Sequence, residues 1–242
     1  MKKKRLTYLM LAAAVLLLLG STVGSTRAAL TYYSDNYVAK ITVSQIGVSL
    51  LENGEVVSSR DYNDNAWKVT TNKDGDSVNG SLLADLLQPE EKLALNKKYD
   101  EKLTVKNSGS IDEYVRVRIY RYWMKDGQKV TTLSPDLIDL NLINSGQWVK
   151  NPNETAECVE LFYKWILKTG METEPFADTV RIDGSLAQEA TIETKGDIVT
   201  TVYKYDGVEF HIDVEVDAVQ THNAKDAIKS AWGVDASGLG IL

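Results

Sequence analysis

The residues able to do acid, base or metal chemistry are few and lie far apart in the sequence. His211 and His222 are the only histidines in the 242 residues. A common zinc protease needs two histidines one helical turn apart with a glutamate between them, so that the ligands converge on one metal. These two are eleven residues apart, one in a predicted strand and one before a predicted helix. We therefore expect no metal site and no cofactor, although two histidines and an acid brought together in space would still suffice for zinc.

A nucleophile is equally hard to identify. Cys158 is the single cysteine, so no intrachain disulfide can form. No base stands near it in the sequence, and Ser108 and Ser110 fall in a predicted turn rather than in a Gly-x-Ser-x-Gly motif. We interpret Cys158 as a small buried apolar residue, with pairing between chains as the alternative. The sequence predicts no catalytic residue and a protein that is not an enzyme.

Two short acidic stretches resemble calcium-binding loops. They are residues 61–65, DYNDN, and residues 72–76, NKDGD. The EF-hand pattern requires glycine at the sixth position and glutamate at the twelfth, and neither stretch meets it. We interpret residues 60–80 as a polar loop, with a weak extracellular calcium site as the alternative.

One predicted strand, residues 114–123, carries an aromatic and basic face. It alternates with a period of two and places Val115, Val117 and Ile119 inside. The candidate surface-binding face is formed by Tyr114, Arg116, Arg118, Tyr120 and Tyr122. Aromatic rings and guanidinium groups suit glycans or acidic polymers.

A structural role for the same face is the interpretation that we favour. The predicted strand 208–219 presents an acidic stripe outward, formed by Glu209, His211, Asp213, Glu215 and Asp217. If the two strands are neighbours, Arg116 and Arg118 pair with these acids across the sheet. The pairing fails if the two strands belong to different sheets.

The elements that must position these residues are mostly strands. Asn53-Gly54, Asp126-Gly127 and Asp206-Gly207 are typical of tight hairpin turns. Further strands are expected at residues 37–51, 102–106, 147–149, 158–166, 175–182 and 198–205. Short helices are expected at residues 81–87, 134–140 and 224–232, the last capped by Asn223 and ended by Gly233. The pattern predicts one mainly β domain, residues 29–242, folded as a jelly-roll-like antiparallel β-sandwich.

The N-terminal residues 1–28 have the order of a secretory signal peptide. Residues 2–5 are basic, residues 6–19 are almost entirely apolar, and small residues lead to a cleavage site near Ala28 or Ala29. Removing this segment takes away five basic and no acidic residues, which leaves 22 basic against 34 acidic residues and a net charge of −12. We expect a secreted or cell-surface protein that meets a signal peptidase, touches the membrane only through the uncleaved signal, and does not bind nucleic acid.

Several stretches resemble a known family. They are residues 2–29 followed by LTYYSD, residues 106–110 (KNSGS) with 114–117 (YVRV), and residues 216–224 (VDAVQTHNA) with 231–233 (AWG). They are similar to Gram-positive proteins exported through the specialised signal peptidase SipW, the TasA and camelysin family. That family includes a biofilm matrix fibre protein and a surface protein classed as a metalloprotease. The resemblance implies a jelly-roll-like secreted domain and assembly into matrix fibres.

Three functions follow as hypotheses. The first is a structural matrix protein that associates with itself or with other matrix proteins, residues 37–50 of one subunit completing the sheet of the next. The second is a monomeric surface-binding module or adhesin that uses the aromatic and basic face. The third is a camelysin-like metalloprotease, which would need one zinc ion per chain. We favour the first.

Overall fold

The computed structural model describes residues 45–63, 66–70, 80, 82–195 and 198–242. The predicted signal peptide, its cleavage site at Ala28 and Ala29, and the whole stretch 72–76 lie outside these residues. Within the described ranges, no helix combines the length and the apolar character that crossing a membrane requires.

The first sheet has six antiparallel strands in the order β3-β2-β1-β4-β10-β7. Their bounds are β1 Ile46–Glu52, β2 Glu55–Asn63, β3 Ala66–Val69, β4 Tyr99–Asn107, β7 Ile138–Leu142 and β10 Ala177–Ile182. The β1–β2 turn has Asn53 and Gly54 at φ 52° and 92°, which confirms the predicted tight hairpin. Strand β1 is paired on both edges, with β2 and with β4.

The second sheet has five antiparallel strands, in the order β13-β5-β9-β8 with β6 beside the end of β5. Their bounds are β5 Glu113–Lys125, β6 Gln128–Val130, β8 Trp148–Lys150, β9 Cys158–Tyr163 and β13 Glu209–Gln220. The predicted turn at Asp126 and Gly127 is confirmed, because it joins β5 to β6 with both residues at positive φ.

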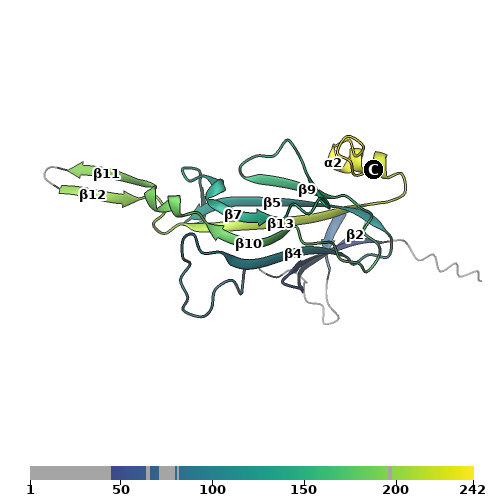
Figure 1. The fold of residues 1–242 in the computed structure, drawn as a ribbon, viewed down its shortest axis with the longest axis horizontal. Coiled ribbons are helices and arrows are strands. Elements are labelled where there is room, and N and C mark those ends of the chain that lie inside the picture. The colour runs from purple at the N-terminus through teal and green to yellow at the C-terminus, as the bar shows by residue number, and fades with distance from the viewer. Residues whose placement is uncertain (1–44, 64–65, 71–79, 81, 196–197) are drawn as a thin grey trace, which may run out of the picture. The chain divides into compact units, whose positions relative to one another are not determined.

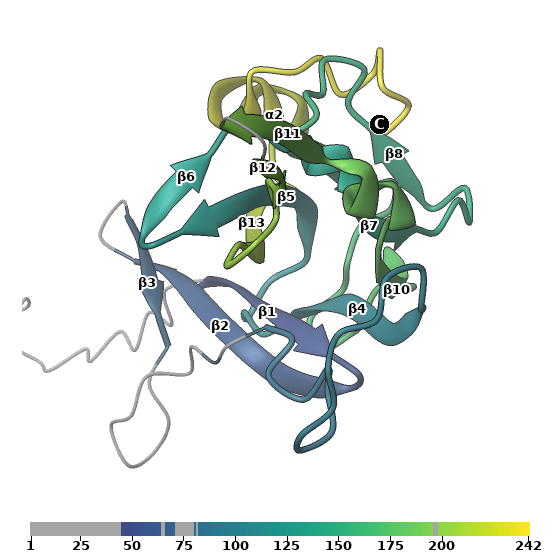
Figure 2. The ribbon, with the colours of Figure 1, turned by 90° about the vertical axis from the view of Figure 1, so that its left-hand side faces the viewer.

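The two sheets enclose one apolar core (Figure 1 and Figure 2). Val115, Val117 and Ile119 of β5 are fully buried in it, as the alternation predicts, and they meet Leu103 and Val105 of β4. The expected mainly β class with antiparallel sheets is therefore confirmed.

The hairpin predicted at Asp206-Gly207 is wrong. Strand β12, Ile198–Tyr203, pairs with β11, Ala190–Lys195, in a separate two-stranded sheet, whereas β13 belongs to the second large sheet. Gly207 does take a positive φ of 66°, but the turn connects two sheets instead of two partners. A turn signal specifies the local backbone and not the pairing of the strands beside it.

The helix α2, Ala224–Trp232, ends at Gly233 in the left-handed conformation, as predicted. Asn223 is the N-cap residue, as predicted, but it has φ 52° and makes no side-chain capping bond. With the C-terminal residues, α2 builds a second apolar cluster on the outer face of the second sheet, around Phe162 and Ile228.

Three other local predictions are corrected. Residues 82–87 form turns and no helix, although their sequence is rich in leucine. Within the expected polar loop 60–80, the structure has the end of β2 and all of β3. The expected helix 134–140 is reduced to a single 3-10 turn, Pro135–Leu137, followed by β7.

Candidate functional site

Strands β5 and β13 lie side by side, and their pairing decides what the predicted binding face can do. The register is continuous over the twelve residues of β13 and sets Arg118 opposite Glu215 and Arg116 opposite Asp217. The prediction that the basic and acidic stripes are neighbours on one sheet is therefore confirmed.

Arg116 is held on three sides. Its Nε and Nη2 donate to the two Asp217 oxygens at 3.0 and 2.8 Å, and its Nη1 donates to Glu160 Oε1 at 2.9 Å. Its guanidinium carbon lies 5.4 Å from the ring centroid of Trp232. The Arg116 side chain is 11% exposed and that of Asp217 is 9% exposed. A two-pronged, largely buried pair of this kind is a rigid part of the sheet, and not a cation available to a ligand.

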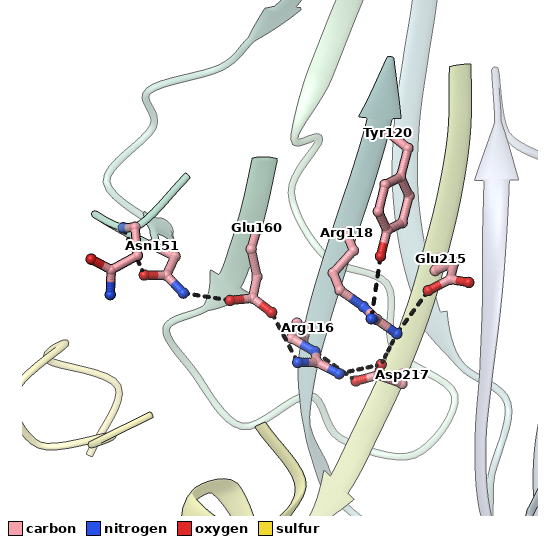
Figure 3. A network of polar contacts seen from close by, with 8 residues as sticks. Arg116, Arg118, Tyr120, Asn151, Glu160, Glu215 and Asp217 are labelled. Atoms are coloured by element: carbon pink, nitrogen blue, oxygen red, sulfur yellow. Dashed lines mark hydrogen bonds and ion pairs between the residues drawn. The ribbon is translucent and has the colours of Figure 1, made fainter. Parts of the chain in front are cut away.

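Arg118 extends the same network, which Figure 3 shows. Its Nη2 lies 2.7 Å from a Glu215 oxygen and 3.5 Å from an Asp217 oxygen. Its Nη1 is 3.3 Å from the Tyr120 hydroxyl. Both arginines of the predicted face are thus neutralised by carboxylates of the same protein.

The three tyrosines of the face differ in their burial and in their contacts. Tyr114 is buried, because it packs in the cluster built by α2. Tyr122 donates from its hydroxyl to Asp213 at 2.7 Å and stacks on His211 with the ring centroids 5.2 Å apart. All five predicted residues lie on one face of β5. The two arginines are engaged in ion pairs and Tyr114 is buried, so only Tyr120 and Tyr122 remain partly exposed and outside an ion pair. The sequence could not show that α2 covers Tyr114.

The other edge of β13 has no partner strand among the described residues. In β5, the N–H groups of Glu113 and Arg121 point toward the β9 side, where they donate to Leu167 and Glu157. Backbone groups alternate in direction along a strand, so the even-numbered residues of β5 face β13 and bond with its odd-numbered residues. The even-numbered residues of β13 therefore point their N–H and C=O groups to the free edge. They are Phe210, Ile212, Val214, Val216, Ala218 and Gln220.

Two cavities follow this free edge. One of about 700 Å³ lies between residues 209–214 and the strands β1 and β2, where Leu50 and Val57 line it. The other, of about 610 Å³, lies beside residues 217–220 and is lined by Tyr62, Trp67 and Trp232. We call the free edge of β13 with these two cavities the β13 groove. It combines backbone groups that have no partner strand in the described part of the chain with walls of mixed apolar and polar side chains, which suits an extended polypeptide.

The described chain begins at one end of the β13 groove. Gln45 exchanges hydrogen bonds with Ser110, and Ile46 lines the cavity beside residues 217–220. Leu50 lines the other cavity, beside residues 209–214. Strand β1 therefore runs in the opposite direction to β13, and its first residue, Ile46, lies near the Gln220 end of the groove.

The remaining candidate chemistry is dispersed. His211 lies on the outer face of β13, and His222 is exposed in the turn before α2. No three His, Cys, Asp or Glu side chains within the described ranges gather closely enough to hold a metal ion. Cys158 is half-buried, and burial raises the pKa of its thiol. Asp61 of the first calcium-like stretch accepts a bond from the Thr70 hydroxyl at 3.1 Å.

Comparison with known proteins adds no relative: no family model, no curated protein and no solved structure matches the chain.

Proposed function

We propose that this chain is a secreted structural protein of an extracellular or biofilm matrix, a jelly-roll-like β-sandwich that assembles into fibres by strand addition in the β13 groove. The observation that carries the proposal is the 12-residue strand β13, unpaired on one edge within the described part of the chain and flanked by two cavities that both apolar and polar side chains line. An exposed strand of this length is a template for pairing with another chain.

The donor that fits is the segment of a second copy upstream of β1. The sequence predicts residues 37–50 as donor, but residues 46–50 belong to β1, which pairs with β2 and, from Val48 on, also with β4. This leaves residues 37–45 of the predicted donor, and we extend the proposed donor upstream to residue 30. Residues 37–43 alternate in the way that a half-buried strand requires. Their apolar set is Tyr37, Ala39, Ile41 and Val43, and the residues between them are Val38, Lys40 and Thr42.

The directions of β1 and β13 favour exchange between copies. A segment that continues straight upstream from Gln45 passes beyond the Gln220 end of its own β13 groove. A second copy placed beyond that end in the same orientation receives the segment antiparallel to its β13, which is the slightly more stable pairing. Within one chain, the segment would have to turn back and run parallel to β13. Head-to-tail contacts that do not close produce open filaments.

Signal cleavage is the natural trigger for this assembly. Before cleavage, residues 30–45 are attached to the membrane-directed segment 1–28. Cleavage near Ala28 or Ala29 by the signal peptidase frees the donor, which keeps polymers from forming before export.

The test uses the mature chain, residues 29–242, and a variant that lacks residues 30–44 but retains Gln45 and β1. We expect the mature chain to grow into large β-rich species, followed by size-exclusion chromatography with light scattering over time and pH. The variant should remain a monomer with an unchanged circular dichroism spectrum and melting temperature. Equal growth of the variant would overturn the donor assignment, and a mature chain that stays monomeric would overturn assembly itself.

The alternative function is a monomeric surface-binding module or adhesin. Its support is now reduced to Tyr120 and Tyr122, because Arg116 and Arg118 are paired and Tyr114 is buried. A camelysin-like metalloprotease requires one zinc ion per chain and an activity that a chelator abolishes.

A further inference from the structure

Residues 82–87 occupy one side of the β13 groove. Together with Phe210 and Ile212 they line the cavity of about 700 Å³. Four leucines of this segment, Leu82, Leu83, Leu86 and Leu87, are partly buried and pack against the main core. The segment thus forms one wall of the cavity beside residues 209–214 of β13 and narrows this end of the groove.

The conformation of this segment conflicts with its sequence. Leucine and alanine at these spacings are typical of a helix, and the sequence predicts one. The structure has turns instead, with Leu83 in the left-handed region at φ 64°, which is unfavourable for any residue with a bulky side chain. A local preference that opposes the observed structure marks a segment with a second accessible conformation.

One side chain of β1 holds the segment. The Leu83 N–H donates to Glu52 Oε1 at 2.6 Å. Glu52 in turn shares a hydrogen bond with Glu101, which is 1% exposed and whose Oε1 has no partner in the described structure. Burial, with the carboxylate of Glu52 beside it, raises the pKa of Glu101 to about 8, so Glu101 is protonated at neutral pH and can donate to Glu52. The Glu52 carboxyl group thus lies between Glu101 and the Leu83 N–H.

We propose that residues 82–87 are a displaceable plug of the β13 groove, held by the Glu52 carboxylate, which an incoming strand must release before it pairs with the first half of β13. The inference rests on the proposed function, because it describes how the same groove is kept closed in the free subunit. Strand addition then begins at the open cavity beside residues 217–220 and is completed only when the plug leaves. The plug therefore slows assembly of the monomer.

The experiment compares Glu52→Ala with Glu55→Ala in the mature chain. Glu55 is the exposed partner of Glu52 across the Asn53-Gly54 turn, so its removal changes the charge equally and leaves Leu83 anchored. Hydrogen exchange of the amides of residues 82–87 and the rate of polymer growth are measured together. Glu52→Ala should raise both by about tenfold, because a hydrogen bond to a charged acceptor is lost. Glu55→Ala should change neither.

A second pair of variants leaves β1 untouched. Leu86→Asp places a charge on a partly buried leucine of the plug, and Gln88→Asp places it on an exposed residue just beyond. Faster growth with Leu86→Asp alone supports the plug. Faster hydrogen exchange of residues 82–87 without faster polymer growth, in either Glu52→Ala or Leu86→Asp, would overturn the plug. Unchanged hydrogen exchange in both variants would also overturn it.

A synthetic peptide of residues 30–45 separates failure of the plug from failure of the proposed function. If the peptide binds the mature chain and the amides of residues 82–87 lose protection, the plug is supported even where polymers do not form. Binding with unchanged protection overturns the plug and leaves strand addition intact. A peptide that binds no variant, including those with a released plug, overturns both.

Discussion

Proline at position 214 tests the β13 groove without disturbing the sheet that carries it. The N–H of Val214 points away from β5, because the even-numbered residues of β13 face the free edge. Proline has no N–H, and its ring occupies the space where an added strand must lie. Val214→Pro therefore removes a donor that an incoming strand needs and that has no partner strand in the described part of the subunit.

The magnitude follows from the groups involved. Val214 is half-buried, so replacing its side chain with the proline ring costs the subunit only about 1 kcal/mol of folding free energy. In the assembly, one inter-strand hydrogen bond is lost and its acceptor on the incoming strand is left without a donor, which together cost about 2–3 kcal/mol. This corresponds to a rise of about 30- to 150-fold in the subunit concentration needed for growth.

Asp213→Pro is the matched control, because residue 213 is the neighbour of residue 214 and its backbone N–H points to the other side of β13. The N–H of Asp213 faces Tyr120 in the ladder between β5 and β13. Proline there removes a bond that the subunit itself uses, which costs about 3 kcal/mol and lowers the melting temperature. The two prolines should thus separate assembly from stability.

The assay is sedimentation of the mature chain over a range of concentrations, with thermal unfolding of each variant. Val214→Pro should leave the melting temperature within a few degrees of wild type and abolish polymers at concentrations where wild type forms them. Polymers of Val214→Pro that form at the wild-type concentration would refute strand addition at β13, whatever the fate of the donor segment.

Two further predictions concern stability. Arg116→Ala leaves Glu160 without its cation and Asp217 with only the 3.5 Å contact to Arg118, both in a largely buried place. Urea unfolding should therefore show a loss of about 3 kcal/mol, whereas alanine at the exposed Lys150 should cost less than about 0.5 kcal/mol. An equal effect of the two changes would contradict the network. Burial raises the pKa of Glu113 to about 9 from a usual value of 4.5. The proton bound to Glu113 therefore stabilises the folded state, fully so below pH 4.5. This contribution to stability is lost as the pH rises to about 9. Unfolding free energies measured from pH 5 to 9 should fall by several kcal/mol, on the order of the pKa shift, and the fall should flatten in Glu113→Gln; a slope that the variant leaves unchanged would assign the effect elsewhere.

The strands that carry the network could be predicted because each has its own periodicity. In residues 114–123 and 208–219 the alternation is regular, and the charges of the two stripes are complementary. Complementary charge is a signal of pairing between distant segments, and it identified β5 and β13 as neighbours. The tight turns at Asn53-Gly54 and Asp126-Gly127 were predictable for the same reason, since the positive φ is a property of those residues themselves.

What the sequence could not show depends on contacts between elements. Residues 82–87 carry a helical pattern, yet the Glu52 carboxylate and the cavity beside β13 hold them in turns. The alternation along β5 predicts that Tyr114 is exposed, but α2 covers that end of the face. The turn at Asp206-Gly207 has the expected backbone and joins strands of different sheets. In each case tertiary packing overrides a correct local signal.

The composition of β13 argues that its free edge has an occupant. Soluble proteins protect long edge strands with lysine, proline, bulges or charges that point into the edge. Residues 209–220 contain neither lysine nor proline, and their pairing with β5 has no bulge. The acids of β13 do not protect the edge either, since Glu215 and Asp217 are committed to Arg118 and Arg116 of β5. The residues whose backbone groups face the free edge are apolar from Phe210 to Ala218, and their side chains pack in or against the core, so they place no charge at the edge. A strand of the same kind of chain, added antiparallel beside β13, gives this edge the partner for which its sequence is suited.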